Sequence, residues 1–168
     1  YVCALPLYHI FAFTVNMMLG MRVGAKNILI PNPRDLAAVL KELAKHQVHS
    51  FPAVSTLFNG LVNHPDFNKV DWSHLRVSLG GGMAVQSAVA KLWLEKTGCP
   101  ICEGYGLSET SPSASCNPTI SKVFTGTIGV PIPSTWFKLL DDEGREVAQG
   151  QPGEIAIKGP QVMAGYWQ

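Results

Sequence analysis

Apolar and polar positions along the first two thirds of the chain alternate in a way that predicts strands followed by helices. Short apolar runs such as "VCALP" and "NILIP" are typical of buried strands. Leu36, Leu40 and Leu43 then recur at helical spacing. The same scheme returns at "VHSFPA" with "STLFNGLVNHP", and at "LRVSLGGGM" with "AVQSAVAKLWLEKTG". We therefore expect an α/β fold, with a mostly parallel sheet flanked by helices and a binding surface at the carboxyl ends of its strands.

The first 21 residues carry no charged side chain and raise the question of a membrane segment. Pro6, His9 and Asn16 interrupt this stretch, so a strand followed by a buried helix over residues 10–21 is the better expectation. On this interpretation, the methionines of the stretch pack in the core.

The pattern changes after about Pro118, where helical periodicity stops and glycine and proline recur every few residues. This change predicts a small β-rich, barrel-like subdomain and a boundary between Asn117 and Gly126. We expect an α/β subdomain over residues 1–120 and a β-rich subdomain over residues 121–168 that is truncated at its C-terminal end. The chain starts without methionine and stops directly after "GYW", so we expect it to be a fragment of a larger two-domain enzyme.

Composition and charge narrow the function classes. The 168 residues are 46% hydrophobic, and 13 basic residues balance 12 acidic ones to a net charge of +1. Because no basic run alternates with aromatic residues, nucleic acid is not an expected partner. Cys99 and Cys102 form a C-x-x-C motif, but a strand is expected there rather than a helix start, so ordinary reduced cysteines are favoured. No secretory signal is visible, and a cytoplasmic location is expected.

Two glycine-rich loops follow predicted strands and are candidate ligand sites. The first contains Gly80, Gly81 and Gly82, where missing side chains would let a ligand reach the backbone. The loop has neither the lysine of a phosphate-binding P-loop nor the glycine spacing of a dinucleotide site. A tight strand-to-helix turn explains these glycines equally well.

The second loop, "GYGLSETSP", is more specific. Tyr105 stands between Gly104 and Gly106 and offers a planar ring for stacking on a base. Ser108 provides a neutral donor, and Glu109 provides the anionic oxygen that Mg²⁺ accepts. The alternative is local: Ser108 caps a short helix, and Glu109 only favours its dipole.

Four motifs, "PLYHIFAF", "GGGM", "GYGLSETSP" and "GEIAIKGPQVMAGYW", occur in this order and together resemble the adenylate-forming (AMP-binding) superfamily. Within it, the chain is most similar to bacterial long-chain fatty acid CoA ligases. The resemblance covers all 168 residues. It implies a two-step reaction in which a fatty acid and ATP form an acyl-adenylate, and the thiol of CoA then displaces AMP.

The resemblance also implies roles for individual residues. Gly80, Gly81 and Gly82 would line the adenine pocket, with Gly104 and Gly106 making room for Tyr105 to stack on the base. Ser108 would bind the α-phosphate, and Glu109 would hold Mg²⁺. His9 would lie beside the reacting carboxyl group, and Phe13 would gate the acyl tunnel. The family usually has threonine where this chain has Ser108, but the hydroxyl is retained.

The resemblance leaves three classes of function to separate. No Asp or Glu precedes Asp35, which disfavours an amino-acid substrate, and the apolar surroundings of His9 suit a hydrophobic tail. The alternatives are another adenylate-forming enzyme, of the aryl-CoA ligase, luciferase-like or peptide-synthetase type, and a non-catalytic α/β module. We expect the isolated fragment to be inactive and to self-associate through exposed apolar surface, and the parent enzyme to associate peripherally with the inner membrane face.

Overall fold

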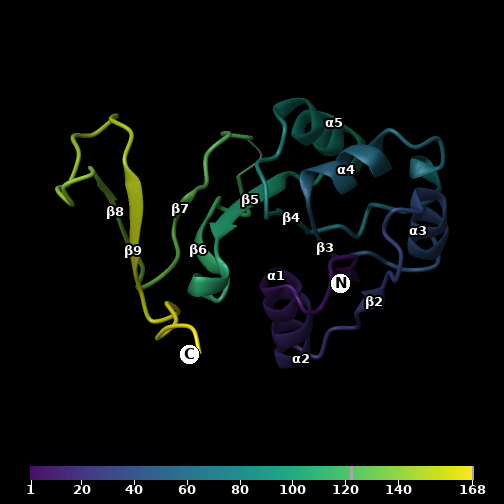
Figure 1. Cartoon of the computed structure of the whole chain (residues 1–168). Helices are drawn as coiled ribbons and strands as arrows, with labels where there is room; N and C mark the ends of the chain where they lie inside the picture. Colours follow the sequence, from purple (N-terminus) through teal and green to yellow (C-terminus); the bar gives the residue numbers. More distant parts are fainter. Residues whose placement is uncertain (122, 168) are drawn as a thin grey trace.

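The computed structural model describes residues 1–121 and 123–167. Lys122 and Gln168, which both fall in the expected β-rich subdomain, lie outside the described residues. Figure 1 shows helices gathered around the first strands, with a separate hairpin near the C-terminal end. The strands are β1 (Val2–Cys3), β2 (Ile28–Leu29), β3 (Ser50–Ala53), β4 (Val77–Gly80), β5 (Ile101–Gly106), β6 (Ser113–Cys116), β7 (Val130–Pro131), β8 (Trp136–Leu140) and β9 (Glu154–Lys158).

The predicted alternation of strands and helices is confirmed in the first part of the chain. Strands β3, β4 and β5 pair in parallel, and α4 (Ser55–Val62) and α5 (Ser87–Thr97) connect them. Both helices lie together over these strands in Figure 1. Helix α3 (Leu36–Leu43) begins where the Asp35 carboxylate accepts a hydrogen bond from the Ala38 N–H. The carboxyl ends of β4 and β5 therefore meet at one edge of the sheet.

An aromatic cluster fills the core between the sheet and these helices. The Trp93 ring is fully buried and meets the Phe58 ring edge-on, with centroids 4.7 Å apart. Phe51 and Phe67 contact Trp93 in the same tilted manner. The indole N–H of Trp93 donates to the Ser78 hydroxyl, so its polar atom is satisfied. This packing holds α5 against β4 and fixes the start of the loop that follows β4.

The predicted helix near the N-terminus exists, but its expected burial was wrong. It runs through α1 (Ile10–Ala12), a π-helical turn η1 (Phe13–Met18) and α2 (Leu19–Arg22). Ala12, Asn16 and Gly20 form its buried face, where Ala12 and Gly20 are small and the Asn16 amide donates to the Val2 carbonyl oxygen. Phe13, Met18, Leu19 and Met21 are exposed, with Met21 at 74%, whereas the other large apolar residues of the helix are half-buried. No helix among the described residues is long and apolar enough to cross a membrane.

The second part of the chain corrects the predicted fold class. Strand β6 pairs antiparallel with β5, and β7 pairs antiparallel with β6, so the five-stranded sheet is mixed rather than mostly parallel. Strands β8 and β9 form a two-stranded antiparallel sheet. The expected barrel was wrong for the described residues, because two paired strands cannot close into a ring. The proposed subdomain limits, 1–120 and 121–168, stay a prediction.

Candidate active site

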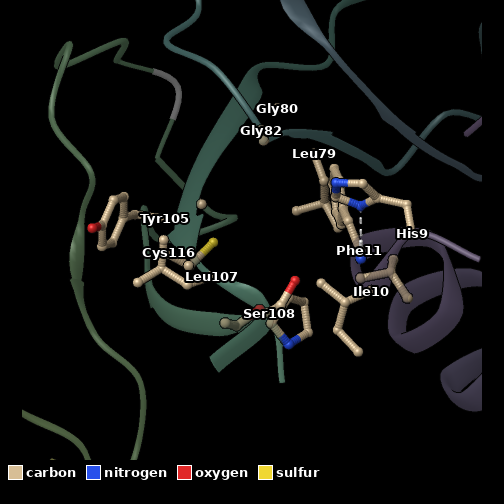
Figure 2. A pocket seen from close by; sticks show the side chains of 16 residues that line it. His9, Ile10, Phe11, Leu79, Gly80, Gly82, Tyr105, Leu107, Ser108 and Cys116 are labelled. Atoms are coloured by element: carbon tan, nitrogen blue, oxygen red, sulfur yellow. Dashed lines mark hydrogen bonds between the residues drawn. The ribbon is translucent and has the colours of Figure 1, made fainter. Parts of the chain in front are cut away.

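A cavity of about 280 Å³ opens at the carboxyl ends of β4 and β5 and is bounded on the other side by α1. In Figure 2, Tyr105 lies on one side of this cavity, and His9 and Phe11 lie on the opposite side. Three separate segments of the sequence thus meet at one place. The sequence-predicted residues that line the cavity are His9, Gly80, Gly81, Gly82, Gly104, Tyr105, Gly106 and Ser108.

The loop after β4 contains glycine for steric reasons that can be named. A Cβ on Gly80 would lie 2.6 Å from the Val85 side chain, and a Cβ on Gly81 would lie 3.0 Å from the Phe11 ring. Gly82 has a φ of 78°, which L side chains rarely adopt. The turn interpretation therefore holds for these glycines. It is compatible with ligand binding, since the same bare backbone lines the cavity.

The loop after β4 is supported by a charged residue, Glu103, that the sequence did not single out. The Glu103 side chain lies in β5 and is 9% exposed. Its Oε1 accepts a hydrogen bond of 2.8 Å from the Val85 N–H, which ties β5 to the loop after β4. The position of an acid inside the apolar strand "PICEGYG" was the available signal, because an isolated carboxylate is rarely buried without a partner.

The glycines around Tyr105 differ in how strictly they are required. A Cβ on Gly106 would lie 1.6 Å from the Pro112 carbonyl oxygen, a position that no side chain can occupy. A Cβ on Gly104 would lie 3.6 Å from the Ser115 carbonyl oxygen, which is ordinary contact. The β5–β6 pairing shifts register between Tyr105 and Gly106. Close approach of the two strands therefore accounts for Gly106, whereas Gly104 leaves one face of the cavity open.

Ser108 and Glu109 belong to a short 3-10 turn, η3 (Ser108–Thr110). Leu107, rather than Ser108, takes the N-cap position, and the Leu107 N–H donates to the Thr110 hydroxyl. The local interpretation of Ser108 as a helix cap was therefore wrong. Ser108 lines the cavity instead.

Glu109 lies beside the cavity rather than in its lining. Its Oε1 accepts a hydrogen bond from the Tyr166 hydroxyl, and its carbonyl oxygen accepts one from the Met163 N–H. The bond from Tyr166, assisted by a backbone hydrogen bond, holds the pKa of the Glu109 carboxyl below its usual value. The carboxylate is thus anionic at neutral pH. No sequence pattern indicates this contact, because Tyr166 lies 57 positions after Glu109 in the chain.

His9 occupies the N-cap of α1, and its orientation follows from a single hydrogen bond. Its Nδ1 accepts from the Phe11 N–H at 3.2 Å. An accepting Nδ1 is unprotonated, so the neutral ring carries its proton on Nε2 and can donate from there. His9 is exposed and lines the cavity.

Phe13 does not line the cavity, whereas Phe11 does. Four residues along an α-helix return to the same face, but His9 precedes the first helical residue, so this spacing does not place Phe13 beside it. Phe13 is 38% exposed, and its role as a gate stays a prediction. The apolar part of the lining comes from Ile10, Phe11, Val15 and Leu79.

The two cysteines of the C-x-x-C motif are buried thiols. Cys99 and Cys102 are buried and free, and Cys102 lies within β5, as the strand prediction for this motif required. Burial raises the pKa of Cys102 to about 11, opposite to the shift of a reactive thiol. Among the described residues, no three His, Cys, Asp or Glu side chains gather as a potential metal site.

The cavity brings together two glycine loops, an aromatic ring and a hydroxyl, and a carboxylate lies beside it. A comparison with known protein families agrees with this arrangement. Residues 1–167 match the sequence model of the family described as AMP-binding enzyme. The chain therefore belongs to the AMP-binding enzyme family, and the resemblance of its motifs to that superfamily is confirmed.

Individual relatives narrow the comparison within this family. The chain is 52% identical over 167 residues to the long-chain-fatty-acid–CoA ligase of Escherichia coli O6:H1; the match covers 99% of the chain and 30% of the relative's length. An anthranilate CoA ligase in complex with anthranoyl-AMP superposes with a TM-score of 0.91 at 27% identity, covering 99% of this chain and 32% of that one. The O-succinylbenzoate coenzyme A synthetase of Bacillus subtilis, in complex with ATP and magnesium ion, gives 0.82 at 27% identity, with coverage of 98% and 34%.

Proposed function

We propose that this chain forms one side of the adenylation site of a long-chain fatty acid–CoA ligase. The observation that supports the proposal most directly is the convergence of Tyr105, Ser108 and His9 on one cavity. In the reaction, a fatty acid carboxylate attacks the α-phosphorus of ATP, and pyrophosphate leaves. The CoA thiol then attacks the acyl carbon of the adenylate and releases AMP.

The nucleotide would occupy the Tyr105 side of the cavity. The Tyr105 ring would stack on adenine, and the backbone of Gly80, Gly81 and Gly82, which also line the cavity, would face the edge of the base. The Ser108 hydroxyl would donate to the α-phosphate, where negative charge must be stabilised during attack. These roles agree with the family match and with the ATP complex of a relative named above.

Glu109 fits a magnesium ion by its chemistry. Its carboxylate is anionic and partly exposed beside Ser108, and Mg²⁺ in proteins prefers one or two carboxylate oxygens together with phosphate oxygens. When bound, the ion would neutralise charge on the phosphates. Glu109 is the residue of this chain that would hold the ion.

The fatty acid would enter from the opposite side. The Nε2–H of His9 is available to donate to the carboxylate and hold it in line with the α-phosphate. Phe11, Val15 and Leu79 provide apolar contact for the first methylenes, each worth about 0.8 kcal/mol when buried. The long-chain assignment rests on the 52% identity to the ligase of E. coli.

An aromatic acid is the second candidate substrate, because a structure with a TM-score of 0.91 belongs to an anthranilate CoA ligase. A benzoate ring would be held by the same His9 and Phe11. Identity favours the fatty acid, at 52% against 27%. We propose a cytoplasmic location with peripheral association with the inner membrane face; the four free cysteines suit a reducing compartment.

The Ser108 assignment can be tested by replacing the hydroxyl alone. In the full-length enzyme that carries this chain, Ser108→Ala should lower fatty acid-dependent ATP–pyrophosphate exchange by about 10²-fold, because one donor to the charged centre is lost. Ser73→Ala removes the same atoms from an exposed turn outside the cavity and should leave the rate unchanged. An unchanged rate for Ser108→Ala would remove Ser108 from the phosphate site.

A further inference from the structure

The chain folds back on itself after β9 and contacts the turn that carries Glu109. We propose that Tyr166 is a positioning residue: its hydroxyl orients the Glu109 carboxylate for a divalent cation. The inference rests on the proposed magnesium role of Glu109. It adds a residue from the far end of the chain to that site, beyond the glycine loops and the Ser108 turn.

Two anchors place the returning segment before Tyr166 is reached. The Gln161 amide donates to the Ser113 carbonyl oxygen at 3.2 Å and to the Thr135 hydroxyl at 3.0 Å. Thr135 is buried, so the Gln161 amide is bound to a residue that is itself fixed in the fold. The Met163 N–H then donates to the Glu109 carbonyl oxygen at 2.9 Å. The backbone around Glu109 is therefore bound to the segment independently of any contact by Tyr166.

Glycine at the first position of the turn that starts the segment leaves room for the Gln161 side chain. A Cβ on Gly159 would lie 2.3 Å from Oε1 of Gln161 and 3.0 Å from the Thr135 hydroxyl oxygen. A side chain at Gly159 would displace the Gln161 amide from the position in which it donates to Ser113 and Thr135. Hydrogen bonds of Gln161 and Met163 hold the segment, and Figure 1 shows it ending close to the turn between β5 and β6.

The hydrogen bond from Tyr166 suits the orientation of a metal ligand. The phenol donates to Oε1 of Glu109 and leaves Oε2 for another partner. A lysine or arginine at this position would orient the carboxylate too, but its positive charge would repel a cation. A neutral donor fixes the side chain without that repulsion, and such outer partners of ligating carboxylates strengthen metal binding.

The proposal predicts a change in metal affinity when one oxygen atom is removed. In the full-length enzyme, Tyr166→Phe should raise the dissociation constant of Mn²⁺ about 10-fold, measured by electron paramagnetic resonance with a non-hydrolysable ATP analogue present. The KM for fatty acid should stay unchanged, because the acyl side of the cavity is untouched. A merely structural role for the hydroxyl would not separate these two quantities.

Two further variants make the outcome decisive. Tyr8→Phe removes the same atom from a side chain that is 93% exposed and should leave Mn²⁺ binding unchanged. Glu109→Gln should weaken Mn²⁺ binding at least as much as Tyr166→Phe does. If Glu109→Gln weakens binding and Tyr166→Phe does not, the positioning role is overturned while the proposed site stands. If Glu109→Gln has no effect, the proposed magnesium role of Glu109 itself fails.

Discussion

At the scale of single residues, the motifs identified much of the lining of the cavity, and the structure adds steric reasons for some of it. Gly106 was expected to make room for Tyr105 to stack on a base, and the Pro112 carbonyl oxygen independently excludes a side chain there. Glu103 and Tyr166 were missed, because a buried carboxylate and a contact across 57 residues depend on the three-dimensional path of the chain. The spacing of the motifs indicates which residues line the cavity. It says little about the residues that hold this lining in place.

The two glycines beside Tyr105 provide a matched test of this distinction. Gly106→Ala should destabilise the full-length enzyme by several kcal/mol or prevent folding, because strand β6 must move away from β5. Gly104→Ala has ordinary contact distances and should change the unfolding free energy by about 1 kcal/mol or less. Urea denaturation of both variants measures the difference. Equal destabilisation would show that close approach to Pro112 does not explain Gly106.

At the scale of elements, hydrophobic periodicity was sufficient to predict a helix and its buried face where only one face of the helix is apolar. Helix α3 was predicted from Leu36, Leu40 and Leu43, and Leu40 and Leu43 are buried. The helix over residues 10–22 was predicted as an element but with the wrong environment. Its apolar side chains occur on all sides, so the pattern cannot indicate that the narrow face with Ala12 and Asn16 is the buried one.

Asn16 tests that assignment of the buried face. Its amide is fully buried and donates to the Val2 carbonyl oxygen at 2.9 Å. Asn16→Ala should lower the unfolding free energy by about 1–3 kcal/mol, because a buried carbonyl group loses its donor. Asn63→Ala removes an exposed amide that bonds only within its own helix end, and it should have little effect. Comparable small changes in both variants would contradict the buried position of Asn16.

At the scale of the whole molecule, the sequence predicted the α/β part and the β-rich character of the C-terminal part, but not how the later strands pair. The parallel strands β3, β4 and β5 contain mostly apolar residues, and helices separate them. The hydrophobic period of strands and that of helices can therefore both be recognised in this part of the sequence. Strand β6 reads "SASC" and β7 has two residues, and neither contains a hydrophobic pattern; pairing with β5 makes them strands. The barrel was inferred from recurring turn residues. Such residues indicate that strands are present, but not whether the strands close into a barrel.

The substrate of the full-length enzyme provides the most direct test of the proposed adenylation site. Pyrophosphate release should be measured with saturating ATP, Mg²⁺ and CoA against saturated fatty acids from dodecanoate to octadecanoate, substituted benzoates and amino acids. The proposed function predicts the highest kcat/KM for the fatty acids, with the matching acyl-CoA as product. Faster turnover of benzoates or amino acids would contradict the long-chain assignment, and no pyrophosphate release with any acid would contradict the adenylation site itself.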